Sequence, residues 1–206
     1  AVRFAGSPVR LARADVLRAG FLRNLGRVEE AGRLSERAAL VLEQAGDQEW
    51  AVTCYALLTG IADDRGDDPA AARWAELAVR VARAGAPRRL PDALGYLAYA
   101  LGATGQPDRA AEVAREALSL LDEVESPGMR AGTRINAAMA LIEAGQGVVA
   151  REVLISGLSD LRQAPEGIPN YFVNLGWAHL ATGEPAEALR CFRRFLDEAA
   201  HMDEWL

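Results

Sequence analysis

Apolar side chains recur at spacings of three and four residues along most of the chain, which is the pattern of amphipathic helices. Two such runs are Leu118, Leu121 and Val124, and Leu154, Leu158 and Leu161. The sequence contains no alternating run of β-branched and aromatic residues bounded by turns, so no β-sheet is predicted. We predict ten helices, over residues 10–25, 27–45, 47–65, 68–84, 89–104, 107–124, 128–144, 147–163, 168–182 and 185–200.

A glycine recurs at a nearly constant interval and marks the turn between two helices. The positions are Gly26, Gly66, Gly105, Gly145 and Gly183, so the interval hardly varies from one copy to the next. A glycine in the left-handed conformation ends a helix without strain at Cβ. Asp or Pro soon follows, as in RGDDPAAA, TGQPDRAA and TGEPAEAL, and starts the next helix. Each copy of the repeat therefore contains one pair of helices.

Small residues recur at two fixed distances from these glycines. Five residues after them stand Ala31, Ala71, Ala110, Ala150 and Ala188. Seven residues before them stand Ala19, Thr59, Ala98, Ala138 and Gly176. Because a small side chain lets two helix backbones approach closely, we expect the paired helices to touch at these positions.

The fifth copy carries the fullest pattern and resembles a tetratricopeptide repeat. Phe172, Leu175, Gly176, Gly183, Ala188 and Phe192 match the positions typical of that family, with His179 where an aromatic residue is usual. The resemblance covers essentially the whole chain and implies an all-α, right-handed α-solenoid of about five antiparallel helix pairs. HEAT repeats have a similar period but fit the small-residue and turn positions less well.

The repeat period is longer than that of the family, in which one copy takes about 34 residues, whereas the turn glycines here give copies of about 40 residues. Copies of this longer kind resemble the sensor regions of large bacterial signal-transduction ATPases and of LuxR-type transcription activators. We expect one repeat domain over residues 1–206, with copies at about 10–46, 47–86, 87–125, 126–165 and 166–200.

The two ends of the chain favour a piece of a longer protein. The chain begins with Ala1, and Trp205 follows Gly183 at nearly the same distance as Trp50 follows Gly26. Residues 201–206 are therefore interpreted as the start of a further copy. Since stacked repeats need polar end caps, we expect self-association through exposed repeat ends.

Composition narrows the classes of function. Half of the residues are apolar and a quarter are charged, as in globular proteins. All 23 basic residues are arginine, which excludes mechanisms that need a lysine. The net charge of −6 has the wrong sign for nucleic-acid binding through a general basic face. No apolar run is long enough to span a membrane and no signal-peptide pattern is present, so we expect no membrane partner and a cytoplasmic location.

The residues that carry catalytic or metal chemistry form no recognisable constellation. His179 is interpreted as a packing residue, and neither it nor His201 has a partner at metal-ligand spacing. The acidic stretch DDRGDD at 63–68 is interpreted as helix capping rather than a calcium loop. Cys54 and Cys191 are expected to be reduced thiols. We therefore predict a protein that is not an enzyme, without metal or cofactor.

The family resemblance implies a concave groove lined by the first helix of each copy. Counted from the turn glycines, the side chains selected are Asp92, Tyr96, Tyr99, Asn136, Met139, Asn170, Asn174 and Trp177, with Arg13, Arg23, Thr53 and Asp63 in the first two copies. Tyr99, Met139 and Trp177 occupy one register position, bordered by Asn136 and Asn174. This stripe fits an extended peptide, a partner helix or a small-molecule effector. The alternative is that the stripe packs against neighbouring copies.

Two functions remain open. The first is a non-catalytic interaction or ligand-sensing domain, the regulatory segment of a larger bacterial signalling or transcription regulator. The second is a free-standing adaptor scaffold that joins partner proteins.

Overall fold

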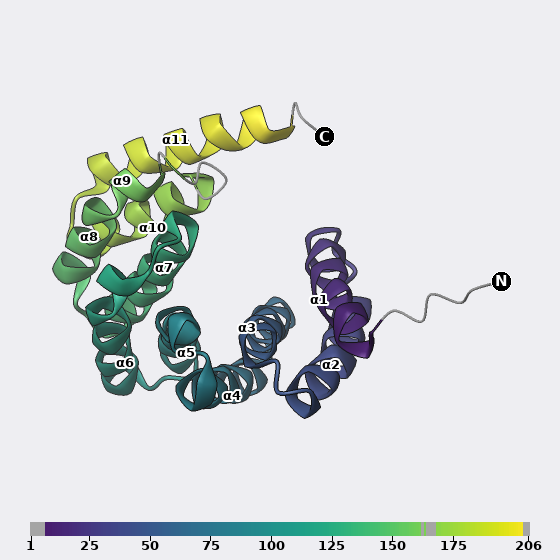
Figure 1. The fold of residues 1–206 in the computed structure, drawn as a ribbon. Coiled ribbons are helices and arrows are strands. Elements are labelled where there is room, and N and C mark those ends of the chain that lie inside the picture. Colours follow the sequence, from purple (N-terminus) through teal and green to yellow (C-terminus); the bar gives the residue numbers. More distant parts are fainter. Residues whose placement is uncertain (1–6, 162, 164–167, 204–206) are drawn as a thin grey trace. The chain divides into compact units, whose positions relative to one another are not determined.

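The computed structural model describes residues 7–161, 163 and 168–203, and within them every regular element is a helix. The predicted all-α class is therefore confirmed. The chain divides into two compact units, residues 1–93 and 94–206, and Figure 1 shows each as a series of antiparallel helix pairs. The residues interpreted as the start of a further copy include 204–206, which lie outside the described part of the chain.

The first unit contains two helix pairs. Its elements are α1 (Pro8–Asn24), α2 (Val28–Gln44), α3 (Gln48–Asp64), α4 (Asp68–Gly85) and the 3₁₀ helix η1 (Pro87–Arg89). Helix α1 packs against α2 and α3 packs against α4, while α2 also lies against α3. The second helix of one copy thus stacks on the first helix of the next, which buries the apolar faces that a single hairpin leaves exposed.

The second unit repeats this arrangement. Its elements are α5 (Leu90–Ala103, which begins at the end of the first unit), α6 (Pro107–Ser119), the 3₁₀ helix η2 (Leu121–Glu123), α7 (Pro127–Glu143), α8 (Gly147–Ser156), α9 (Leu158–Leu161), α10 (Ile168–Ala181) and α11 (Pro185–Asp203). Helix α7 pairs with α8, and α10 pairs with α11. The copies stack through contacts of α6 with α7 and of α8 with α10.

The five turn glycines have the predicted left-handed backbone. Their φ angles are 74° at Gly26, 67° at Gly66, 73° at Gly105, 72° at Gly145 and 75° at Gly183. After each, a backbone N–H donates to the carbonyl five residues earlier, as from Gln106 to Leu101 at 3.0 Å. Both features define a Schellman motif, which satisfies carbonyls at the helix end.

The small residues predicted to lie between paired helices are buried. Ala19, Ala31, Ala98, Ala110, Ala138 and Ala150 are fully buried, and Thr59, Ala71 and Ala188 are nearly so. A Cβ on Gly176 would overlap Cε1 of Phe192, so only glycine admits that ring. In the first unit, Ala19 and Ala31 share one apolar cluster with Leu22, Leu34 and Ile61.

The predicted helix over 107–124 is wrong at its end. Helix α6 stops at Ser119 and is followed by a 3₁₀ turn, after which Val124 is extended. Leu121 and Val124 are nonetheless buried, so their three-residue spacing reflects burial of the connection rather than a continuing helix. The extended backbone leads into Pro127, the first residue of α7.

The predicted helix over 147–163 is also wrong, because it breaks at Gly157. The hydroxyl of Tyr171 donates to the carbonyl of Leu154, which a continuing helix would use. A Cβ on Gly157 would overlap that hydroxyl and lie 2.6 Å from Cδ of Arg134. The glycine therefore allows α10 and α7 to approach the break, and the chain resumes as the short helix α9.

The break places Asp160 against two arginines of α7. Arg130 donates to Oδ1 of Asp160 from Nε at 3.0 Å and from Nη2 at 2.6 Å, and Arg134 donates to Oδ2. Asp160 is buried, which by itself raises its pKa, but the hydrogen bonds and charges of the two arginines outweigh burial. The net pKa of Asp160 lies below its ordinary value.

Two glycine substitutions in the second unit should change stability in opposite directions. Gly105→Ala should lower the free energy of unfolding by about 1 kcal/mol, because Gly105 has a φ of 73°. Gly132→Ala should raise it by roughly 0.5 to 1 kcal/mol, because Gly132 lies inside α7 with open space at its Cβ position. Urea unfolding followed by circular dichroism measures both, and the same sign for the two variants would contradict the turn assignment.

Asp160→Asn should lower the free energy of unfolding at pH 7 by about 3 kcal/mol, because it leaves two arginines without their carboxylate. Since the pKa of Asp160 is depressed on folding, its contribution is complete above the unfolded value of about 4 and is lost as pH falls towards the folded value. Unfolding at pH 7, 5 and 3.5 tests this, with Asp122→Asn as a control at an exposed aspartate. A gap between wild type and Asp160→Asn that does not narrow in acid would refute the prediction.

Candidate functional site

Three consecutive first helices, α5, α7 and α10, carry the predicted groove residues of the second unit. Helix α7 lies against α10. Helix α5 approaches α7 closely at Gly95, where a Cβ would lie 3.4 Å from Cα of Thr133 and 3.5 Å from Cβ of Asn136. The half-buried Asn136 therefore stands at the contact between α5 and α7.

The residues of the aromatic stripe differ in exposure. Tyr99 and Met139 are half-buried, as is Tyr96, whereas Trp177 is 51% exposed. The Trp177 ring makes an edge-to-face contact with Phe192 of α11, with 5.8 Å between ring centroids. One part of Trp177 is thus fixed by packing within its own helix pair, and the rest faces solvent.

Leu180 extends the exposed part of α10 by one helical turn. It is 41% exposed and follows Trp177 by three residues. The sequence analysis did not select Leu180, although it selected Arg23 and Asp63 at the same register position, three residues before the turn glycine. That register position, together with the three-residue spacing from Trp177, was the available signal. We call Trp177 and Leu180 the α10 patch.

Two asparagines border the α10 patch on the same helix. Asn170 is exposed and Asn174 is half-buried. The side-chain amide of Asn174 donates to the backbone carbonyl of Asn170 at 2.7 Å, which fixes the orientation of Asn174. Both side chains carry donors and acceptors suited to a peptide backbone.

Asp92 belongs to the first unit, at the start of α5. Its carboxylate pairs with Arg89 of η1 at 3.1 Å, and Arg89 also donates to Oγ1 of Thr53 in α3 at 3.1 Å. Burial raises the pKa of Asp92, and the charge of Arg89 opposes that shift. This aspartate therefore takes part in a cluster that ties η1 and the start of α5 to α3.

The turn between α10 and α11 is held by Glu184. Arg151 of α8 donates to Oε1 of Glu184, and Oε2 lies 2.6 Å from Nδ1 of His179. The hydrogen bond from Arg151, followed by that from His179, lowers the pKa of Glu184 to about 2. His179 is only 12% exposed and contacts its own hairpin turn, which confirms the packing role predicted for it.

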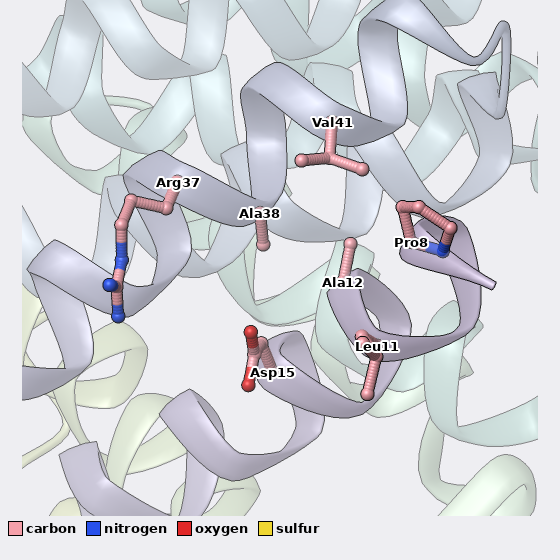
Figure 2. Close-up of a pocket in the computed structure, with 7 residues that line it drawn as sticks. All are labelled: Pro8, Leu11, Ala12, Asp15, Arg37, Ala38 and Val41. Carbon is pink, nitrogen blue, oxygen red and sulfur yellow. The ribbon is translucent and has the colours of Figure 1, made fainter. Parts of the chain in front are cut away.

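The first unit has a separate pocket of about 330 Å³ between α1 and α2. Figure 2 shows Ala12 and Ala38 facing each other across it, with Asp15 and Arg37 towards one end. Pro8, Leu11 and Val41 complete the lining. An apolar floor beside two opposite charges can hold an amphipathic side chain of a partner.

Within the described residues, no cluster of three or more His, Cys, Asp or Glu side chains is placed to bind a metal. In the same part of the chain, no helix combines the length and apolar character needed to cross a bilayer. Burial raises the pKa of the Cys54 thiol to about 12, and burial also raises that of Cys191. Since the thiolate is the nucleophile, these shifts make both thiols poorly reactive at neutral pH.

Comparison with known proteins agrees with this geometry. A family model described as tetratricopeptide repeat matches residues 91–116 and 170–194, which lie in the third and fifth copies. These two stretches of the chain are tetratricopeptide repeats. Among curated proteins, no relative matches this chain.

Solved structures share the fold of this chain. BtubC from P. vanneervenii has a TM-score of 0.67 at 20% identity, covering 95% of this chain and 82% of BtubC. A putative kinesin light chain from Podosopora anserina, with nearly identical TPR-like repeats, has a TM-score of 0.63 at 20% identity, covering 95% and 98%. NprR in complex with its cognate peptide NprX has a TM-score of 0.65 at 14% identity, covering 97% of this chain and 58% of NprR. These likenesses confirm the helical repeat fold.

Two aromatic residues on α10 should contribute very differently to stability. Tyr171→Ala should lower the free energy of unfolding by about 4 kcal/mol, because Tyr171 is fully buried. Trp177→Ala should cost only about 1 kcal/mol, because half of its side chain is already in water. Urea unfolding measures both, and similar losses would mean that Trp177 serves packing rather than a binding surface.

Proposed function

We propose that this protein is a non-catalytic interaction module that binds a peptide segment of a partner on the first-helix face of its second unit. The observation that carries the proposal is the α10 patch, where Trp177 and Leu180 are 51% and 41% exposed on adjacent helical turns. Large apolar side chains exposed together favour a contact surface, because covering them removes apolar area from water.

The chemistry of neighbouring side chains favours a peptide ligand. Asn170 and Asn174 offer amide donors and acceptors for a backbone. Tyr99 and Met139, half-buried on the two preceding first helices, supply adaptable apolar area. The expected ligand is a segment with one or two large apolar side chains seated on Trp177 and Leu180, and with its backbone amides near the asparagines.

One of the similar structures was solved with a bound peptide. NprR was solved with its cognate peptide NprX. Because NprR and this chain are 14% identical, the likeness is one of fold alone. It supports a peptide as the class of ligand and gives no information on the sequence of that peptide.

We further propose that peptide binding serves regulation in a larger, cytoplasmic bacterial regulator. The support is the long interval between the turn glycines, from Gly26 to Gly183, which resembles that of sensor regions in such proteins. In this role the bound segment would alter how the repeat domain contacts a neighbouring domain.

The proposal is tested by selecting ligands from a displayed library of short random peptides. An enriched peptide is synthesised, labelled and titrated with the 206-residue chain by fluorescence anisotropy. The double substitution Trp177→Ala and Leu180→Ala should weaken binding at least about tenfold, since aromatic residues dominate peptide interfaces.

The matched control is Ile155→Ala, because Ile155 is an equally exposed apolar residue, at 48%, on the second helix α8. That variant should bind within about twofold of wild type. Peptides that bind equally well to wild type and to the double variant, or a selection without enrichment, would overturn the proposed function.

A further inference from the structure

Glu143, the last residue of α7, is an exposed carboxylate without a cation beside it. In the part of the chain that the structure describes, no arginine or histidine pairs with it. Asp160 and Glu184, in contrast, each pair with an arginine. The C-terminal end of a helix carries partial negative charge, so a carboxylate there is stabilised by a nearby cation. Glu143 is therefore available to a positive charge from outside the chain.

The first unit shows how a carboxylate in this position is satisfied. Alignment of the turn glycines Gly66 and Gly145 places Asp64 of α3 in register with Glu143. Arg23 of α1 donates to Asp64 from Nε to Oδ2 at 2.5 Å and from Nη2 to Oδ1 at 3.0 Å. A guanidinium from the preceding first helix thus engages both carboxylate oxygens, which is the strong form of this ion pair.

The second unit lacks the corresponding arginine. Counted from the turn glycines, the residue in register with Arg23 is Gly102 of α5. A Cβ on Gly102 would lie 3.5 Å from Cγ of Glu143 and 3.6 Å from its Cβ. The two positions therefore face each other as those of Arg23 and Asp64 do, but a glycine supplies no cation.

Met139 decides the side from which a cation can approach. In the first unit the Arg23 guanidinium lies over Gly60, where a Cβ would come within 2.6 Å of Nη1. Met139 takes the register position of Gly60 in α7, so a guanidinium cannot lie there in the same way. A cation reaches Glu143 from the solvent side instead, and its methylene stem can lie along the half-buried Met139.

Glu143 lies near the end of the α10 patch. Helix α10 ends at Ala181, directly after Leu180. A Cβ on Gly147, the first residue of α8, would lie 2.8 Å from Cβ of Ala181, so the ends of α7 and α10 are neighbours. The axes of two packed helices are about 8–10 Å apart. An extended peptide spans that distance in about three residues, so a ligand that covers Leu180 can also reach Glu143.

From this correspondence we propose that Glu143 is a specificity-determining residue, which selects peptides that carry Arg or Lys about three residues from their apolar anchor. The cation of the ligand would take the part that Arg23 has at Asp64 in the first unit. Arginine suits this part best, because its planar fork can engage both carboxylate oxygens. The inference rests on the proposed peptide binding at the α10 patch, and it adds the charge that the ligand must carry.

The first test repeats the random-peptide selection with wild type and with Glu143→Gln. Peptides enriched on wild type should carry Arg or Lys at a constant spacing from a large apolar residue, and those enriched on Glu143→Gln should lose that preference. An enriched basic peptide should bind Glu143→Gln about threefold more weakly in fluorescence anisotropy, since one exposed ion pair contributes modestly. Glu152→Gln, which removes an exposed carboxylate from α8, should bind it like wild type.

A charge exchange separates direct recognition from a structural role of Glu143. Glu143→Arg should bind the basic peptide at least about tenfold more weakly, because two like charges then meet. A peptide with Glu in place of its basic residue should bind Glu143→Arg more tightly than it binds wild type. Circular dichroism checks that the variants are folded, and Glu143→Lys provides a second charge reversal should Glu143→Arg be unfolded.

The outcomes distinguish this inference from the proposed function. Enriched peptides that depend on Trp177 and Leu180, yet show no basic preference or bind the Glu143 variants like wild type, would overturn the role of Glu143 alone. A selection without any enrichment would overturn both proposals.

Discussion

The close approach of two helices at a pair of small residues is the contact on which the rest of this structure depends. Ala19 and Ala31 are fully buried in one cluster between α1 and α2, and Ala98 and Ala110 are fully buried at the same register positions. A glycine with positive φ reverses the chain between them at the required distance. Such a hairpin has more apolar surface than it can bury, so each pair stacks on the next through the second helix.

Stacking through second helices leaves one face of each first helix for other uses, and the two units use it differently. In the first unit, the Arg23 guanidinium lies over Gly60 and pairs with Asp64 at 2.5 Å, so an ionic contact covers Gly60. In the second unit, Met139 and Trp177 occupy the register position of Gly60. The apolar α10 patch therefore arises from side chains placed on a backbone pattern common to both units.

Arginine side chains form the ionic contacts at the places where the chain departs from the regular repeat, and the sequence contains no lysine. Arg130 uses two nitrogens on one oxygen of Asp160 and also donates to the carbonyl of Val124 at 2.6 Å. A planar guanidinium with several donors can join three segments in this way, which an ammonium group cannot do with fixed geometry. Here it ties the connection after α6 and the short helix α9 to α7.

The sequence by itself determined the helix pairs, their turns and their contact points, because Gly183 and Ala188 and their counterparts act through local backbone sterics and side-chain size. It did not determine where α8 ends, since that depends on the Tyr171 hydroxyl reaching Leu154 from another helix. Nor did it separate Trp177 from Tyr99 and Met139, which share a register position but differ in exposure. The exposure of Leu180 and the pairing of Asp92 with Arg89 likewise became visible only in the tertiary structure. Exposure and ion pairing depend on which neighbouring helices cover a side chain, and the order of residues along one helix does not specify its neighbours.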